Sequence, residues 1–335
     1  MRRLIVLAVV FMMIFSAVAG VWLTTNVQAK TVGAQTSSAR AMATVEMTTG
    51  RLLYSKNAHE TMPMASTTKI VTAIAVIENI KDLDEPVKID NKAIGIEGTS
   101  IYLQKGESLT VRELLYGLML RSGNDCAVAL AIHVGGSEEK FNEMMLNVAR
   151  KAGAVNSSFK NAHGLDEEGH LTTAHDLALI SAYAMRNPEF AKIAATKDIT
   201  INGPEYKRPL ANKNRLLRSN PDVVGVKTGF TSKAGRCYVG ALRDNGMTVI
   251  CVVLNCGPMF PESENLMESA INEFFMHKIL CSQKVITNKK QTVMVAKDFY
   301  YPLRQGEVDK IEVKVKDSEI TVFLDGKLVH TVPYL

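Results

Sequence analysis

The sequence predicts an α+β fold, in which an antiparallel sheet is built from both ends of one domain and a helical insertion lies between them. Strand-like alternation of apolar and polar residues, bounded by turn residues, occurs at 41–55 and returns at 223–255. The intervening segment, 66–186, carries helical spacing and helix-capping residues instead. Strands at both ends with helices between them predict one sheet that is covered by helices.

The first residues are expected to be a secretory signal peptide, 1–29. Arg2 and Arg3 precede an uncharged apolar stretch that ends at Leu23, and the small residue Ala29 follows a polar break. Cleavage is expected after Ala29, and Ala19 ends a second possible site. Because the apolar stretch is long enough to span a bilayer, an uncleaved membrane anchor is the alternative. We expect an extracytoplasmic protein, secreted or associated with the cell envelope, which contacts a membrane through this segment only.

Two domains are expected to follow, a large one at 30–280 and a small β-rich one at 281–335. In the second, Ile311, Val313 and Val315 alternate with charged residues, and further strand-like runs surround an Asp-Gly turn at 325–326. This segment carries no evident catalytic grouping.

In the first half of the large domain, 44–47 and 51–55 flank a Thr-Thr-Gly turn and predict a hairpin. A helix follows from Ser66 to about Asn79, and 80–109 is expected to contain short strands and loops. Thr110 and Glu113 form a capping box, so a helix begins there. After the turn residues 121–125, further helices are expected from 126, over 138–152 and over 174–186.

In the second half, strands are expected at 223–230, 237–243 and 247–255, and a closing helix at 262–280. The Asn-Gly pair at 245–246 predicts a two-residue turn between the last two strands. Its register places Cys237 opposite Leu254 and not opposite Cys251. The five cysteines are odd in number and irregularly spaced, so we expect free thiols.

The charge distribution excludes some classes of function. The formal net charge of +5 is mild and the charges are scattered, so we expect no nucleic-acid partner. His163, His170 and His175 fit no usual spacing of zinc ligands and lie in a loop that leads into a helix. We therefore expect neither a metal nor another cofactor.

The strongest chemical signal is Ser66 followed by Lys69. Residues three apart lie on the same face of a helix, so the Ser66 hydroxyl and the Lys69 amine can meet. The same spacing occurs from Ser137 and from Ser157, but only Ser66 begins a segment apolar enough to be buried. Burial lowers the pKa of a lysine, and a neutral amine can take a proton from serine. The pair predicts a nucleophile beside its base.

Two further clusters supply partners for this pair. Ser122 and Asn124 lie on a turn between two predicted helices, where their side chains can point into a cleft. Lys227, Thr228 and Gly229 lie on a predicted strand, and alternation puts Lys227 and Gly229 on one face. A glycine facing the site would leave room for a substrate backbone along the strand.

The motifs Ser-x-x-Lys, Ser-x-Asn and Lys-Thr-Gly, in this order, resemble those of the penicillin-recognising serine enzymes, which share a β-lactamase/transpeptidase-like fold. The surrounding residues 121–127, 161–165 and 225–231 are similar to the D-alanyl-D-alanine carboxypeptidases of the low-molecular-weight penicillin-binding type. The similarity covers about residues 35–280, and the strand-rich tail is similar to the accessory domain of that family.

The resemblance implies acyl transfer on a peptidoglycan stem peptide that ends in D-Ala-D-Ala, with β-lactams as covalent inhibitors. Ser66 would attack the carbonyl between the two D-alanines and Lys69 would accept its proton. Ser122 would relay a proton to the departing D-alanine. The oxyanion hole would consist of the backbone N–H groups of Ser66 and Phe230.

The substrate-binding residues that the resemblance implies are Asn124, Lys227, Thr228, Gly229 and Phe230. Asn124 would orient the substrate or Lys69, and Lys227 would attract the terminal carboxylate and help to keep Lys69 neutral.

The sequence departs from its relatives in one respect: they often carry an arginine for the carboxylate after the last strand, and 255–277 contains none. The contact would then depend on Lys227 and Thr228, or on Arg236 or Arg243.

Two alternatives have different consequences. A class A β-lactamase would need a Glu-x-x-x-Asn loop, yet Leu171 follows Glu167 and Thr172 follows Glu168 at that spacing. A non-catalytic regulatory protein that binds peptidoglycan or penicillin would keep the pocket without the chemistry. Because all the side chains needed for acylation are present, the carboxypeptidase is the favoured interpretation.

Overall fold

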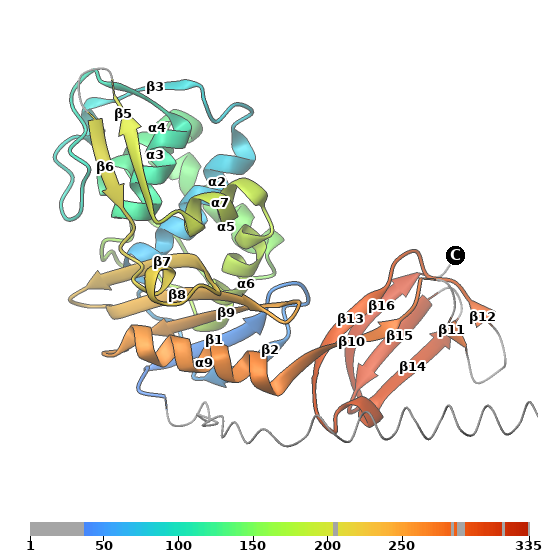
Figure 1. Ribbon diagram of the computed structural model, residues 1–335. Coiled ribbons are helices and arrows are strands. Elements are labelled where there is room, and N and C mark those ends of the chain that lie inside the picture. The colour runs from blue at the N-terminus through green and yellow to red at the C-terminus, as the bar shows by residue number, and fades with distance from the viewer. Residues whose placement is uncertain (1–36, 204–206, 283–284, 287–291, 317–318, 334–335) are drawn as a thin grey trace, which may run out of the picture. The chain divides into compact units, whose positions relative to one another are not determined.

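The computed structural model describes residues 37–203, 207–282, 285–286, 292–316 and 319–333 (Figure 1). The expected signal peptide lies outside these residues. In the described part of the chain, no helix has both the length and the apolar character needed to cross a membrane.

The helices and strands follow the predicted order. The helical segments are η2 (Ala65–Thr68), α2 (Lys69–Asn79), η3 (Asn91–Ala93), α3 (Val111–Tyr116), η4 (Gly117–Arg121), α4 (Asn124–Gly135), α5 (Glu138–Lys151), α6 (Ala174–Met185), α7 (Pro188–Ala195), α8 (Leu216–Ser219), α9 (Met259–Glu273) and η5 (Val308–Lys310). The strands up to residue 254 are β1 (Ala41–Glu46), β2 (Leu52–Lys56), β3 (Pro86–Lys88), β4 (Ser108–Thr110), β5 (Asp198–Asn202), β6 (Lys207–Ala211), β7 (Val223–Thr231), β8 (Gly235–Asp244) and β9 (Met247–Leu254). The later strands are β10 (Phe274–Leu280), β11 (Val285–Ile286), β12 (Thr292–Val293), β13 (Phe299–Arg304), β14 (Ile311–Lys316), β15 (Glu319–Leu324) and β16 (Lys327–Pro333).

The central sheet has the strand order β2-β1-β9-β8-β7, and every pairing is antiparallel. The N-terminal strand β1 pairs with β9, from the far end of the domain. The predicted assembly of the sheet from both ends is therefore confirmed. Asp244 pairs with Met247 and Tyr238 with Val253. This is the predicted register, and continued by one residue it places Cys237 opposite Leu254. All five cysteines are free.

Alternate residues along the strands of the sheet pack into two separate hydrophobic cores, one on each face. On one face, Ala43 and Val252 pack with the helices that include α2 and α6, and on the other, Met42 and Val253 pack with α9. Figure 1 shows α9 running along one face of the sheet. Strand β9 is buried along its whole length, and β8 is buried over its central residues 237–242, because helices cover both faces of the sheet.

The capping box at Thr110 is present. The Thr110 hydroxyl accepts a hydrogen bond from the backbone of Glu113, and the Glu113 carboxylate accepts one from the backbone of Thr110. Thr173 likewise caps α6 by accepting from Asp176 N. These local signals fix where the helices begin.

The prediction of a closing helix over 262–280 is wrong at its C-terminal end. Helix α9 stops at Glu273, and the last seven residues of the predicted helix form strand β10, which pairs with β13. The reason is tertiary packing. The Phe274 ring is buried against the edge of Tyr54, and the guanidinium of Arg304 lies 4.6 Å from its centroid. Helix α7 and the β5–β6 hairpin are further elements that the sequence reasoning did not place.

Beyond residue 280 the structure is a set of strands, as predicted. Strands β14, β15 and β16 form an antiparallel sheet, with Asp325 and Gly326 in the turn between the last two. Arg51 contacts this part of the chain by pairing with Glu307 at 2.8 Å and donating to the carbonyl of Pro302.

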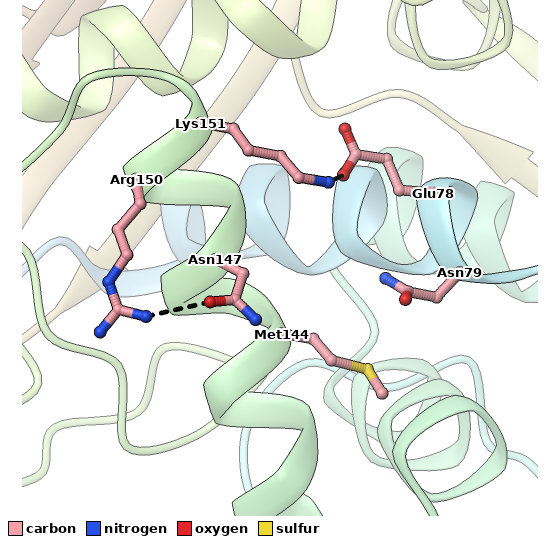
Figure 2. A pocket seen from close by; sticks show the side chains of 6 residues that line it. All are labelled: Glu78, Asn79, Met144, Asn147, Arg150 and Lys151. Atoms are coloured by element: carbon pink, nitrogen blue, oxygen red, sulfur yellow. Dashed lines mark hydrogen bonds and ion pairs between the residues drawn. The ribbon is translucent and has the colours of Figure 1, made fainter.

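A hollow of about 320 Å³ lies beside α2 and α5 (Figure 2). Its cations have partners: Lys151 Nζ lies 2.7 Å from a Glu78 oxygen, and Arg150 donates to the Asn147 amide oxygen at 3.0 Å. With no serine or cysteine among the residues that line it, this hollow is no candidate for nucleophilic chemistry.

Candidate active site

The predicted nucleophile and base are in contact. Ser66 lies in the short helix η2, and Lys69 is the first residue of α2. The Lys69 Nζ atom lies 3.1 Å from Ser66 Oγ, 2.6 Å from Asn124 Oδ1 and 2.5 Å from the carbonyl oxygen of His163. Lys69 is completely buried, whereas Ser66 is partly exposed. Two carbonyl oxygens therefore accept hydrogen bonds from the amine, which also contacts the Ser66 hydroxyl.

Burial lowers the pKa of Lys69 to about 7, and the positive charge of Lys213 acts in the same direction. No carboxylate forms an ion pair with Lys69 among the described residues. A substantial fraction of the amine is therefore neutral near pH 7, as a general base requires.

Ser122 is placed by an irregular turn. It follows the π-helical turn η4 and has a left-handed backbone, with φ of +65°. Its hydroxyl is buried and has no hydrogen-bond partner among the described residues, yet it lines the same cleft as Ser66. A buried hydroxyl without a partner is costly, so it is available to a ligand in that cleft.

Asn124 contacts Lys69 and not the cleft. Its amide nitrogen donates to the carbonyl of Glu97 at 2.6 Å, which fixes its oxygen toward Lys69. Asn124 is not among the residues that line the cleft. Of the two roles expected for it, the geometry favours the orientation of Lys69.

The third motif lies on the edge strand β7. Lys227 is buried and donates to the carbonyl of Thr228 at 3.0 Å. Its burial and the nearby charge of Lys69 lower the pKa of Lys227 well below the ordinary value. A Cβ atom at Gly229 would lie 3.0 Å from the backbone nitrogen of Ser66. Glycine is therefore needed here so that the strand can approach the serine, whereas the sequence suggested room for the substrate.

The cleft has a volume of about 690 Å³, and both serines line it. The residues that line it are Ser66, Thr99, Arg121, Ser122, Ala211, Asn212, Lys213, Arg215, Thr228, Gly229, Phe230, Arg236, Met259 and Phe260. Arg236 is among them, whereas Arg243 donates to the Thr248 hydroxyl at 3.3 Å and does not line the cleft. Of the two arginines considered for the substrate carboxylate, the geometry favours Arg236.

The comparisons with known proteins agree with this geometry. Residues 28–257 match the sequence signature of Peptidase_S11, described as D-alanyl-D-alanine carboxypeptidase. The chain belongs to this carboxypeptidase family. The D-alanyl-D-alanine carboxypeptidase DacF of Bacillus subtilis (strain 168) is 31% identical over 331 residues, which are 91% of this chain and 84% of DacF. DacC of Escherichia coli (strain K12) is 36% identical over 253 residues, 71% of this chain and 62% of DacC.

Solved structures of penicillin-binding proteins share the fold. Penicillin binding protein 5 from Haemophilus influenzae superimposes with a TM-score of 0.77 at 26% identity, over 89% of this chain and 96% of that one. Penicillin binding protein 6B from Escherichia coli superimposes with a TM-score of 0.74 at 29% identity, over 89% of this chain and 95% of that one. The predicted family, the fold class and the activity of a serine-type D-Ala-D-Ala carboxypeptidase are confirmed.

His170 of this carboxypeptidase has a structural role. His170 is buried, its Nε2 lies 2.9 Å from the Thr68 hydroxyl, and its Nδ1 accepts from Lys160 N. Burial lowers the pKa values of His163 and His170 to about 4, so both rings are neutral at pH 7. The described residues contain no group of three or more potential metal ligands.

Two features of the site were not found from the sequence. The His163 carbonyl that accepts from Lys69 is a backbone group, so no side-chain pattern marks it. Gly164, the next residue, has a φ of +88°, and a Cβ atom there would lie 2.0 Å from the carbonyl oxygen of Ala65. The Asn-Ala-His-Gly-Leu run contained this signal, since glycine is the residue that permits a left-handed backbone and a close backbone approach.

Proposed function

We propose that this carboxypeptidase removes the terminal D-alanine from peptidoglycan stem pentapeptides through an acyl-enzyme on Ser66. The observation that carries the proposal is the set of three contacts around the buried Lys69 amine. A neutral amine has two N–H donors and one lone pair. The oxygens of Asn124 and His163 accept the two donors, which leaves the lone pair for the Ser66 hydroxyl proton.

In the proposed reaction, Ser66 Oγ attacks the carbonyl carbon between the two D-alanines while Lys69 takes its proton. The backbone N–H groups of Ser66 and Phe230 stabilise the oxyanion, and losing one such donor costs other enzymes about 3 kcal/mol. The closeness of Gly229 to the Ser66 nitrogen supports this pair of donors. Ser122 then passes a proton to the D-alanine nitrogen while it takes one from the Lys69 ammonium, the C–N bond breaks and D-alanine leaves. Water then hydrolyses the acyl-enzyme and restores the Ser66 hydroxyl.

In this proposal Thr228 and Arg236 bind the terminal carboxylate of the substrate, and the buried Lys227 lies next to them. Thr228 and Arg236 line the cleft, and the Arg236 guanidinium has no partner among the described residues. Lys227 is buried next to the cleft, and a bound carboxylate would favour its charged form. The guanidinium on β8 would therefore replace the arginine that is missing after β9.

Two alternatives are disfavoured by specific observations. No carboxylate lines the described cleft, so a base that would hydrolyse a penicilloyl group, as in a class A β-lactamase, is missing there. Asp166 accepts from the Thr231 hydroxyl and Glu167 from the Asn161 amide. A purely regulatory binder would not need the 3.1 Å contact between base and nucleophile.

We further propose that the protein works outside the cytoplasm, after export by its N-terminal segment, in keeping with a cell-envelope substrate. Residues 281–335 would form a separate accessory domain.

Incubation of the mature protein with a stem pentapeptide tests the proposed activity. We expect release of one D-alanine per peptide, and we expect a penicillin to remain attached as a slowly hydrolysed adduct. Chromatography of free D-alanine and intact-protein mass spectrometry measure the two results. If penicillin acylates the protein but no D-alanine appears, the carboxypeptidase proposal is wrong; rapid turnover of penicillin would favour the β-lactamase.

A further inference from the structure

The cleft is lined by more positive charge than one terminal carboxylate needs. Its lining contains three arginines and one lysine but no aspartate or glutamate, and the cations are Arg121, Lys213, Arg215 and Arg236. Like charges around one cleft repel each other, so such a lining is costly unless an anionic ligand offsets it.

Two of these cations come from other segments than Arg236. Arg236 pairs with Phe230 at the β7–β8 edge of the cleft. Lys213 is beside the Ser122 turn instead: its backbone nitrogen donates to the carbonyl of Leu120 at 3.2 Å, and its Nζ donates to the Thr99 hydroxyl at 3.3 Å. Arg121 immediately precedes Ser122. The cations that line the cleft therefore come from different segments: Arg236 lies at the β7–β8 edge, and Lys213 and Arg121 lie beside the Ser122 turn.

The side chains of Arg121 and Lys213 have no carboxylate partner among the described residues. Other arginines of the same helical region are paired, as Arg112 is with Asp84 at 2.7 Å. Although Lys213 is exposed as a whole, desolvation of its ammonium group and the charge of Arg121 lower its pKa. The two cations are thus close enough to repel each other. An anion bound between them would offset this repulsion.

We propose that Arg121 and Lys213 form a second anion subsite, which binds a carboxylate on the residue that precedes D-Ala-D-Ala in the stem peptide. This inference rests on the proposed function, because it takes the scissile bond to lie at Ser66 and the terminal carboxylate at Arg236. The subsite therefore requires the acyl part of the peptide to lie along the part of the cleft that Arg121 and Lys213 line. The enzyme is therefore selective for stems in which that carboxylate is free and against stems in which it is amidated.

The test compares two N-acetylated peptides, X-D-Ala-D-Ala, in which X carries either a side-chain carboxylate or the corresponding carboxamide. We expect the wild-type kcat/KM for D-alanine release to favour the acid by roughly tenfold or more, as for hydrogen bonds to a charged group. In the Arg121→Gln/Lys213→Gln variant this ratio should fall to about one, chiefly through KM of the acid.

The matched control removes two positive charges elsewhere. Arg150→Gln/Lys151→Gln, at the hollow of Figure 2, lowers the net charge equally and should keep the wild-type ratio. A wild-type ratio near one, or a ratio that persists in the Arg121/Lys213 variant, overturns the subsite. The stoichiometry of the penicillin adduct shows that each variant is folded. If neither peptide releases D-alanine from a wild-type protein that penicillin labels, the proposed function fails and not the subsite alone.

Discussion

The Ser66→Ala variant is expected to form no covalent adduct with penicillin and to release D-alanine at least ~10⁴-fold more slowly than wild type. The expectation follows from the absence of any second hydroxyl that contacts Lys69 among the described residues. Removal of a nucleophile eliminates the acyl-enzyme pathway as a whole, so the loss is much larger than that of a single hydrogen bond. Intact-protein mass spectrometry after incubation with penicillin measures the adduct.

The chain supplies a control for this result in the other Ser-x-x-Lys sequences. Ser137 caps α5 by accepting from Lys140 N at 3.3 Å, so Ser137→Ala should cost about 1 kcal/mol of stability and keep full labelling. Persistence of the adduct in Ser66→Ala, or its loss in Ser137→Ala, would show that the nucleophile has been wrongly assigned.

The Gly164→Ala variant is expected to lose most of its activity although residue 164 carries no catalytic group. An added Cβ atom would lie 2.0 Å from the Ala65 carbonyl oxygen and 2.8 Å from the Thr68 hydroxyl, on the turn that holds Ser66. The preceding residue, His163, supplies the carbonyl that orients Lys69. Moving either backbone by about 1 Å should lower kcat/KM for D-alanine release by about 10²-fold or more. The free energy of unfolding should fall by about 3 kcal/mol.

Gly153→Ala is the matched control for this variant. Gly153 has a similar φ of +80°, but no atom lies within 4 Å of the position of an added Cβ. The left-handed backbone alone should cost about 1–2 kcal/mol and leave D-alanine release unchanged. Denaturant unfolding and the D-alanine assay on both variants separate the two effects. Equal behaviour of the two alanine variants would mean that the close approach at Gly164 has no functional importance.

The parts of the site that depend on local geometry could be predicted from the sequence. Ser66 and Lys69 are three residues apart on one helical turn, and strand alternation alone put Lys227 and Gly229 on one face. The assembly of one sheet from both ends of the domain was inferred from the positions of the strand-like segments, and the pairing of β1 with β9 confirms it. Helical and strand periodicity, in contrast, are short-range rules that determine which side chains share a face.

The parts that depend on distant contacts could not be predicted. The seven residues of β10 are compatible with a continued helix, and only their pairing with β13 and the packing of Phe274 against Tyr54 make them a strand. The His163 carbonyl likewise contacts Lys69 only because separate loops and helices come together. A single sequence carries no periodic signal for such contacts.

The pH dependence of β-lactam acylation tests most directly the claim that Lys69 acts on Ser66 as a neutral amine. Burial lowers the pKa of Lys69 to about 7, and a base must be deprotonated to accept a proton. The first-order acylation constant at saturating penicillin should therefore rise as the pH increases through about 7, and it should be level at higher pH. A constant that is level down to pH ~5, or that rises only toward the ordinary lysine pKa of 10.5, would contradict the account.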